Sequence, residues 1–207
     1  MHTEKPHLVL DVGGVLLANI TPVFWEEAAE LLKVPYTTLR SLYKDQVRQQ
    51  LWDGTIREEE FWAWLQQQSS DENVVLSNVH ITKHLQPLPA WDKVKEWSES
   101  FQIHLLSNHR AEWIIPVLEP IRDYITSMTI SSSVGCSKPD ANIFQLVQEQ
   151  LSGSQPVVFV DDAKQNLAMA KAIGWTTILA DAGHQWIDEI KLHIQEMNGK
   201  KATDRTH

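Results

Sequence analysis

Four short segments of this chain carry side chains that could take part in catalysis, and each carries a different chemical group. Asp11 offers a carboxylate directly after the apolar run Leu8–Leu10, and Ser107-Asn108 offer a hydroxyl and an amide. Lys138 precedes a proline and a helical pattern, and Asp161-Asp162 are adjacent carboxylates at the end of another apolar run. Adjacent carboxylates repel each other unless a cation or hydrogen-bond donors lie close. The set therefore predicts a site with a nucleophile, hydrogen-bond donors and a bound cation.

Together these groups are suited to phosphoryl transfer. A carboxylate such as Asp11 can attack phosphorus and form an aspartyl-phosphate, which is a recognised form of covalent catalysis. Attack by an anion on a phosphate dianion requires charge neutralisation. Mg²⁺ held by carboxylate and carbonyl oxygens could supply it, together with Lys138. Ser107 and backbone N–H groups would complete a phosphate cradle, and the glycines at positions 13 and 14 would let the backbone approach closely.

Each segment also has a purely structural interpretation. An aspartate after an apolar run is often a turn residue, and Asp162 could cap a helix that begins at Ala163. Ser107-Asn108 would suit an ordinary loop, and Lys138 could be a solvated lysine where a helix begins. Chance explains poorly, however, that all four segments follow predicted strands, since open α/β sheets bind ligands at the carboxyl ends of their strands.

The elements that must position these groups alternate between strand and helix. The first strand precedes Asp11, and its apolar residues are typical of an interior strand of a parallel sheet. Further strands are predicted at residues 102–106, 127–131, 156–160 and 176–179, and helices at residues 90–100, 110–118, 140–151, 163–173 and 184–197. Such alternation implies a parallel sheet with helices on both faces. The predicted fold class is therefore α/β, with a doubly wound parallel sheet.

A helical block interrupts this alternation after the first strand. Its apolar residues recur at helical spacing, and it contains no convincing strand. Within it, one helix is expected over residues 37–50. The block therefore reads as an insertion into the α/β unit. We expect an α/β core at residues 1–17 and 87–198, a helical cap at residues 18–86, and a disordered tail at residues 199–207.

The composition is that of an ordinary soluble globular protein, with 43% hydrophobic and 22% charged residues. The formal net charge of −9 argues against a nucleic-acid or membrane partner, although a cation or a lysine can reverse the field inside a cleft. The single cysteine, Cys136, excludes an internal disulfide and suits a reducing compartment. No secretory leader or bilayer-spanning run is evident. We therefore expect a cytoplasmic protein, and the oligomeric state has no signal in the sequence.

The four segments resemble motifs of a known family. Asp11-Val12-Gly13-Gly14-Val15, Leu106-Ser107-Asn108, Ser137-Lys138-Pro139 and Val160-Asp161-Asp162 are similar to motifs I to IV of the haloacid dehalogenase (HAD) superfamily. The resemblance covers essentially the whole chain, because the helical block is similar to the cap between motifs I and II. It implies a Rossmann-like core and a phosphatase, similar to bacterial sugar-1-phosphate phosphatase-like members.

The resemblance also implies a set of Mg²⁺ ligands. Asp11 would be both the nucleophile and a ligand, and the carbonyl of Gly13 would be a ligand that needs no side chain. Asp162 would contact the ion directly, with Asp161 beside it. Asn166, one turn into the following helix, would support these carboxylates.

The phosphate-binding residues implied by the resemblance come from the middle of the chain. Ser107 would bind the transferring phosphoryl group, and Asn108 would contact the substrate. Lys138 would neutralise the phosphoryl group and orient Asp11. The expected substrate is a small phosphorylated metabolite, such as a sugar 1-phosphate or another ester with a good leaving group.

Gly13 departs from the pattern of typical phosphatases of this superfamily, which have an aspartate there that protonates the leaving oxygen and activates water. General acid–base catalysis of this kind contributes about 10²–10⁴-fold. The substrate could therefore have a leaving group that needs little protonation, or the protein could turn over slowly or only bind ligands. Metal-free 2-haloacid dehalogenases also lack this aspartate, but the pair Asp161-Asp162 is poorly suited to a site without metal.

Other residues have both a functional and a structural interpretation. His109 follows the second segment and could contact the substrate, Arg40 could face the cleft or solvent, and Cys136 is expected to fill a small buried space. The tryptophans of the helical block could line a cavity above Asp11 or pack its helices together. Packing is the prediction for Trp64, while both interpretations stay open for the rest, Trp25, Trp52 and Trp62.

Overall fold

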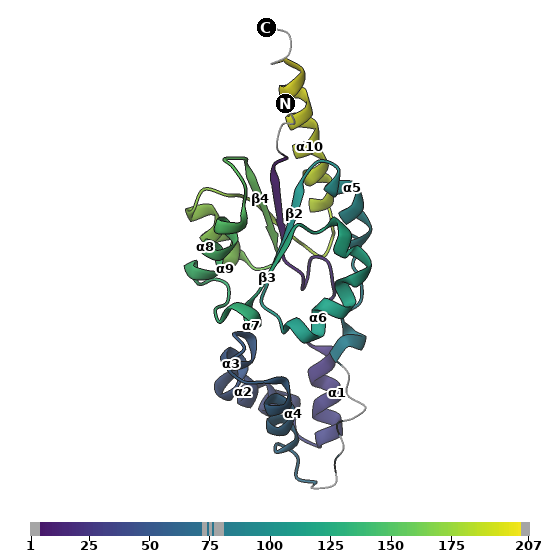
Figure 1. The fold of residues 1–207 in the computed structure, drawn as a ribbon. Helices are drawn as coiled ribbons and strands as arrows, with labels where there is room; N and C mark the ends of the chain where they lie inside the picture. Colours follow the sequence, from purple (N-terminus) through teal and green to yellow (C-terminus); the bar gives the residue numbers. More distant parts are fainter. Residues whose placement is uncertain (1–4, 72–73, 75, 77–80, 204–207) are drawn as a thin grey trace.

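A computed structural model describes residues 5–71, 74, 76 and 81–203 of the chain. Its centre is one sheet of five parallel strands in the order β3-β2-β1-β4-β5 (Figure 1). The strands are β1 (His7–Leu10), β2 (Gln102–Ser107), β3 (Ser127–Ile130), β4 (Val157–Asp161) and β5 (Thr176–Leu179). From β1 the chain adds β2 and then β3 toward one edge of the sheet, and it then crosses back to add β4 and β5 on the other side of β1. The direction of winding therefore changes between β1 and β4, and open α/β sheets bind ligands at such a switch point.

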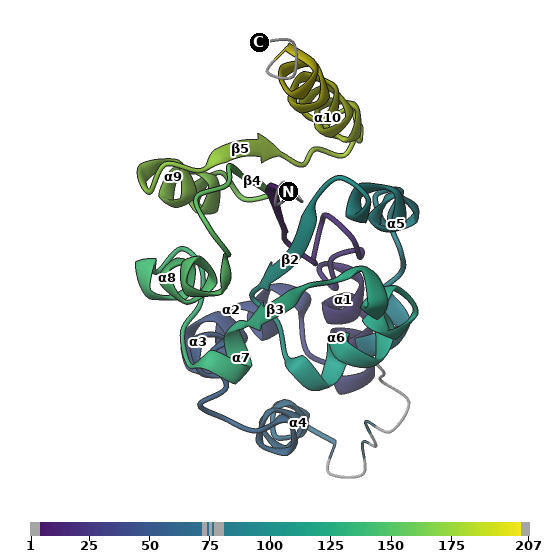
Figure 2. The same ribbon diagram turned by 45° about the horizontal axis from the view of Figure 1, so that its top comes forward.

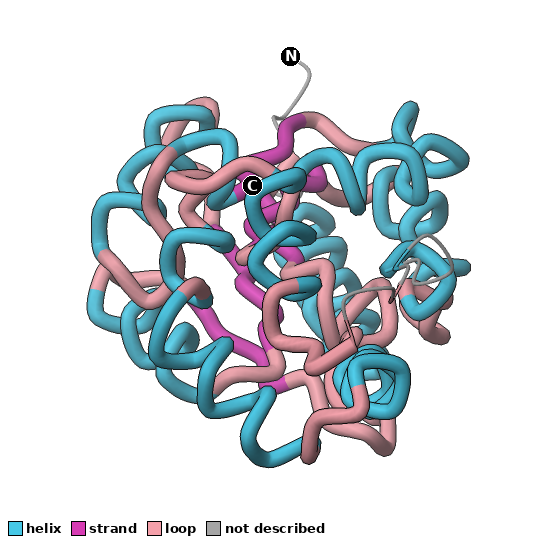
Figure 3. Tube along the Cα trace, turned by 90° about the horizontal axis from the view of Figure 1, so that it is seen from below, coloured by secondary structure: helices cyan, strands magenta, loops and turns pink. Residues whose placement is uncertain are grey.

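Helices cover both faces of the sheet, as the predicted alternation requires (Figures 1 and 3). Leu8, Val9 and Leu10 are all fully buried, which is why this strand is apolar on both sides. One face packs against α5 (Val94–Ser98), α6 (Ala111–Leu118) and α10 (Trp186–Thr203), and the other against α8 (Ala141–Gln150) and α9 (Lys164–Ala172). Short helices η3 (Trp91–Lys93), η4 (Glu119–Tyr124) and α7 (Ser131–Val134) complete this part. The doubly wound α/β prediction is confirmed.

The insert between β1 and β2 lies beyond the carboxyl ends of the strands (Figure 1). It contains α1 (Val23–Leu32), α2 (Tyr36–Gln46), α3 (Arg48–Trp52), α4 (Glu58–Gln66) and η2 (Ile81–His84). The segments that enter and leave it run side by side: Ala18 N–H donates to the carbonyl of Gln86 at 2.8 Å, and Leu88 N–H donates to that of Leu16 at 2.9 Å. The insert is thus tied at its neck to the sheet that it covers.

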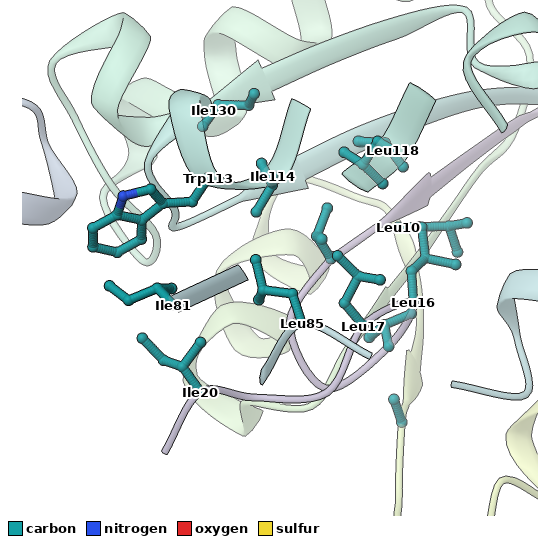
Figure 4. Close-up of a cluster of buried hydrophobic side chains, with 14 of the residues drawn as sticks. Leu10, Leu16, Leu17, Ile20, Ile81, Leu85, Trp113, Ile114, Leu118 and Ile130 are labelled. Atoms are coloured by element: carbon teal, nitrogen blue, oxygen red, sulfur yellow. The ribbon is translucent and has the colours of Figure 1, made fainter. Parts of the chain in front are cut away.

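Insert and sheet share one hydrophobic core. Figure 4 shows Ile20, Ile81 and Leu85 of the insert beside Trp113 and Ile114 of α6, and this cluster continues to the sheet. A second cluster fills the space between the other face and α8 and α9. Because the larger cluster crosses the neck, burial of apolar surface holds the insert against the α/β unit.

The tail prediction is wrong in part. Helix α10 runs through Thr203 and extends away from the sheet (Figure 2), so residues 199–203 are helical instead of disordered. Lysine and alanine are good helix formers, so the composition of this segment is compatible with a continued helix. Residues 204–207 of the expected tail lie outside the described residues. In the described part of the chain no helix is long and apolar enough to cross a membrane.

Candidate active site at the carboxyl ends of the strands

A buried lysine lies between two buried carboxylates at the switch point of the sheet. Lys138 Nζ is 2.9 Å from Asp11 Oδ2 and 2.6 Å from Asp161 Oδ2. Burial lowers the pKa of Lys138, but Asp11 and Asp161 raise it by more, so the ammonium stays charged. Removing charges from water is costly even when they are paired, so stability alone does not account for this cluster.

The loop after β1 fixes Asp11 at the end of the strand. The N–H of Asp11 continues the sheet by donating to the carbonyl of Val160 at 2.9 Å, and Asp11 Oδ1 accepts from Val12 N–H at 2.7 Å. Gly14 has a φ of +73°, and a Cβ there would lie 2.2 Å from Asp162 Oδ2. Only glycine therefore lets the loop and the Asp162 carboxylate lie this close together.

The adjacent carboxylates at the end of β4 have different surroundings. Asp161 is fully buried and accepts hydrogen bonds from Ala163 N–H at 2.8 Å and from Asn166 Nδ2 at 2.9 and 3.0 Å. Asp162 is exposed toward the cavity and accepts from Asn19 Nδ2 at 3.0 Å. Asp161 is therefore occupied by protein donors, whereas Asp162 keeps free acceptor capacity. Asn166 donates to Asp161, which is one of the two carboxylates that the resemblance implied it would support.

Ser107 and Asn108 end β2 and differ in how their side chains are used. Ser107 Oγ is buried and has no hydrogen-bond partner among the described residues, so it can donate to a bound anion. Asn108 Nδ2 donates to the carbonyl of Lys138 at 2.8 Å, and its Oδ1 accepts from Lys138 N–H at 2.7 Å. Asn108 lines the cavity, and its amide holds the Lys138 loop through both of its ends.

Asn19 fills the space beside Gly13. A Cβ on residue 13 would lie 2.8 Å from Asn19 Oδ1 and 3.9 Å from His109 Cδ2. Burial, together with the nearby Lys138 cation, lowers the pKa of His109 to about 4, so this imidazole is neutral at neutral pH. His109 packs its ring on Trp52, with 5.2 Å between the ring centroids. The place of an acidic side chain at position 13 is thus taken by a neutral amide.

The three carboxylates suit a hard cation. Oxygen atoms of Asp11, Asp161 and Asp162 lie within 4.8 Å of one another. Burial raises the pKa of Asp11 to about 7, and Lys138 only partly offsets this. One ammonium does not balance three carboxylates, and an all-oxygen donor set is the kind that Mg²⁺ prefers. These residues therefore fit a magnesium ion.

A cavity of about 430 Å³ opens between these residues and the insert. Ile20, Thr21, Arg48 and Trp52 line it from the insert side. Trp52 is thus a cavity residue, whereas Trp64 packs against the core of the insert, as predicted. Neither Trp25 nor Trp62 is among the residues that line this cavity in the described part of the chain.

Some lining residues were not predicted from the sequence. The sequence offers one signal for Asn19, because it is a polar residue in the apolar stretch after the glycine turn. Arg48 has no sequence signal beyond its position in a helical pattern.

Cys136 is half-buried and not fully buried as expected, because it packs only at the edge of the second hydrophobic cluster. Burial raises the pKa of its thiol, which argues against a nucleophilic role.

Comparison with known proteins identifies the family. Residues 6–174 match the haloacid dehalogenase-like hydrolase family, which is more than half of the chain. The chain belongs to this family. Membership makes this haloacid dehalogenase-like protein a hydrolase, in agreement with the four motifs at its strand ends.

Similar proteins come from Bacteroides thetaiotaomicron. A D-ribitol-5-phosphate phosphatase is 27% identical over 101 residues, which are 44% of this chain and about half, 49%, of that protein. A HAD family enzyme of known structure has a TM-score of 0.78 at 22% identity, over 91% of this chain and 99% of that one. Its Asp-to-Ala mutant, in complex with magnesium and inorganic phosphate, has a TM-score of 0.73 at 23% identity, over 88% and 96% of the two chains. These structural likenesses show that the haloacid dehalogenase-like hydrolase shares their fold.

Proposed function

We propose that this hydrolase is a magnesium-dependent phosphatase that acts on a small phosphorylated metabolite through an aspartyl-phosphate at Asp11. The observation that carries the proposal is the cluster of Asp11, Lys138 and Asp161 beside the unpartnered hydroxyl of Ser107. A nucleophile, a fixed cation and a free donor meet at one cavity, which is the arrangement that phosphoryl transfer needs. The phosphatase relative and the complex of a structural neighbour with magnesium and phosphate support the same reaction.

In the proposed first step, a carboxylate oxygen of Asp11 attacks phosphorus. A new O–P bond forms, the bond from phosphorus to the ester oxygen breaks, and the leaving oxygen takes the electron pair and then a proton from water. Lys138 orients Asp11 and offsets the charge of the phosphoryl group, and the Ser107 hydroxyl donates to a phosphoryl oxygen. In the second step water attacks the same phosphorus, which releases inorganic phosphate and restores the carboxylate of Asp11.

Magnesium, when bound, would neutralise charge on the phosphoryl oxygens. We propose Asp11, Asp162 and the carbonyl of Gly13 as its protein ligands. Asp161 is assigned a supporting role because its oxygens already accept from Lys138, Ala163 and Asn166. Asn108 is assigned to the positioning of Lys138 instead of direct substrate contact, because its amide is occupied by that residue's backbone.

Residues 18–86 are proposed to act as the cap that selects the substrate, over a core of residues 1–17 and 87–198. Trp52 and Arg48 form the insert's wall of the cavity, so they meet the leaving group when phosphorus lies at Asp11. No acidic side chain stands at Gly13, which favours an ester whose leaving oxygen needs little protonation, such as the anomeric oxygen of a sugar 1-phosphate.

The test is phosphate release from a panel of sugar 1-phosphates, sugar 5- and 6-phosphates and nucleoside monophosphates, each with Mg²⁺ or with EDTA. We expect Mg²⁺-dependent release that Asp11→Asn reduces at least about 10³-fold, because an amide is not a nucleophile toward phosphorus. Asp92→Asn makes the same chemical change at an exposed position outside the cavity and should keep full activity.

Three results would contradict the proposal. Undiminished phosphate release by Asp11→Asn would exclude a covalent intermediate at Asp11, and undiminished release in EDTA would exclude a requirement for metal. Binding of Mg²⁺ and inorganic phosphate without turnover of any ester would indicate a ligand-binding protein, which Gly13 and Asn19 would then explain. Chloride release from a 2-haloacid without metal would indicate a dehalogenase.

A further inference from the structure

A second cavity, of about 380 Å³, lies in the insert next to the active-site cavity. It is lined by Thr21, Arg40, Tyr43, Lys44, Arg48 and Trp52. Thr21, Arg48 and Trp52 also line the active-site cavity, so the two spaces meet at a shared wall. We call this second space the cationic cavity. A substrate held with its phosphorus at Asp11 could extend past Trp52 into it.

The cationic cavity concentrates positive charge in an acidic protein. Arg40 and Lys44 are one turn apart on α2, and Arg48 is the first residue of α3, while the whole chain has a formal net charge of −9. None of the three forms an ion pair with any residue that the structure describes. Like charges at helical i, i+4 spacing repel each other, so this arrangement costs stability unless an anion binds there.

Arg40 is held in place by aromatic rings. Its guanidinium carbon lies 5.0 Å from the ring centroid of Trp25 and 5.2 Å from that of Tyr43, both of which are buried. Burial raises the pKa of the Tyr43 hydroxyl, so this wall adds no negative charge at neutral pH. A guanidinium stacked on rings loses little further freedom when it binds an anion, and its planar donors match a carboxylate or a phosphate.

We propose that the cationic cavity binds a second anionic group of the substrate. The substrate class is then a phosphate monoester whose leaving group carries a carboxylate or a second phosphate at its far end. This inference rests on the proposed phosphatase function for the reacting end, and on Arg40, Lys44 and Arg48 for the far end. It gives the insert's charges a role in choosing among phosphorylated metabolites.

The first experiment compares esters that differ only at the far end. One series is glucose 1-phosphate, glucuronic acid 1-phosphate and glucose 1,6-bisphosphate; the other is glycerol 3-phosphate, 3-phosphoglycerate and glycerol 1,3-bisphosphate. In at least one series we expect kcat/KM for one of the charged esters to exceed that of the neutral one by about tenfold or more. The comparison of carboxylate with phosphate identifies which anion is preferred. Equal rates in both series would refute the inference while leaving the proposed phosphatase intact.

The second experiment removes the charges one at a time. Arg40→Gln and Lys44→Gln should each lower kcat/KM for the preferred charged ester by about fivefold and change that for its neutral counterpart less than about twofold. Lys33→Gln removes the same charge from an exposed site of the insert outside both cavities and should leave this preference unchanged. Because Arg40 is half-buried and Lys44 is exposed, the preference should shrink at high salt.

A binding measurement separates failure of this inference from failure of the proposed function. Asp11→Asn loaded with Mg²⁺ is titrated with the same esters in a calorimeter, so no turnover is needed. Tighter binding of the charged esters, lost in the Asp11→Asn, Arg40→Gln double variant, supports the cationic cavity even if no ester is hydrolysed. Equal binding of charged and neutral esters, or preference unaffected by Arg40→Gln, overturns it.

Discussion

Gly13 and Asn19 depend on each other. The space in which a side chain at position 13 would stand holds Asn19 Oδ1, only 2.8 Å from the position of such a Cβ. The other end of the same amide donates to Asp162 Oδ2 at 3.0 Å. The absence of a side chain at Gly13 therefore makes room for a residue that orients a proposed magnesium ligand. An acid restored at position 13 would compete with that contact.

This dependence predicts the behaviour of Gly13→Asp. Alone, it should lower kcat/KM for an alkyl phosphate by about tenfold, because it displaces Asn19 from Asp162. With Asn19→Ser the space is freed, and the double variant should exceed the wild type, since a placed acid contributes about 10²–10⁴-fold. Asn19→Ser alone is the control. A single Gly13→Asp that is more active than the double variant would contradict the steric argument.

At the residue scale, the side chains proposed to take part in the reaction could be predicted from the sequence, but some of the residues that line the cavity around them could not. Asp11, Ser107 and Lys138 are recognisable because each adjoins a strand end, and strand ends follow from local apolar runs. Asn19 and Arg48 reach the cavity only through the way the insert packs. No local pattern encodes that packing, so these residues had to come from the structure.

The turn between α3 and α4 is the element that joins the insert to the α/β unit beyond the neck. Arg110, buried at the start of α6, donates through Nη1 to the carbonyls of Leu51 and Ile56. Gly54 in this turn has a φ of +74°, and a Cβ there would lie 2.1 Å from the carbonyl oxygen of Ser132. Backbone-to-backbone contact this close fixes Trp52, two residues earlier, on the cavity wall.

Gly54→Ala should therefore open the cavity. A Cβ cannot coexist with the Ser132 carbonyl, so the turn must leave α7 and carry Trp52 with it; we expect KM to rise about tenfold with a smaller change in kcat. Gly174→Ala is the matched control, because Gly174 also has a positive φ, +90°, but has nothing within 4 Å of its Cβ position. It should cost about 1 kcal/mol of stability and leave KM unchanged. An equal rise of KM in both variants would attribute the effect to backbone strain alone.

At the scale of elements, the sequence predicted which segments are helical better than it predicted where each helix begins and ends. One helix was expected through residues 37–50, but the chain breaks at Val47, whose φ of −132° ends α2 before α3 begins. That break brings the first residue of α3, Arg48, to the cavities. It arises because Val47 is buried in the shared core, which is a tertiary effect that overrides local propensity.

A chain of hydrogen bonds through two buried histidines links the neighbouring strands β1, β2 and β3. His7 Nε2 lies 2.9 Å from the Ser152 carbonyl and must donate, so its Nδ1 accepts from His104 Nε2 at 3.0 Å. His104 Nδ1 then accepts from the Ser127 hydroxyl at 2.7 Å. Both rings are buried. An added proton has no acceptor between the two imidazoles.

This chain makes stability depend on pH. Burial, with a contribution from His7, lowers the pKa of His104 from 6.5 to about 4, so between these values the unfolded chain binds the proton more tightly. The free energy of unfolding should thus be highest above about pH 6.5 and fall by about 2 kcal/mol as the pH drops toward 4. Urea titrations across this range would measure it. His104→Gln should reduce this slope without abolishing it, because burial also lowers the pKa of His109 to about 4. His193→Gln, outside this chain of bonds, should leave the slope unchanged; an equal slope in His104→Gln and the wild type would contradict the assignment.

At the scale of the molecule, a parallel sheet with helices on both faces could be predicted from the alternation of strands and helices. The packing of the insert on this α/β unit could not be predicted, since it depends on how Ile20, Ile81 and Leu85 meet Trp113 across long sequence separations. Residues 199–203 of the expected tail are helical, because polar composition alone does not exclude a helix continued in α10.

The hydrophobic core that crosses the neck has a consequence for how this enzyme could diversify. An insert with its own core could be exchanged between relatives as a module. Here a foreign insert would leave Trp113 and Ile114 facing unmatched side chains, and a buried mismatch of that size costs several kcal/mol, on the order of 2–5 for each truncated large residue. An exchanged insert would therefore need residues matched to α6, whereas substitutions at polar positions of the cavity walls, such as Arg40 and Arg48, would leave the shared core intact.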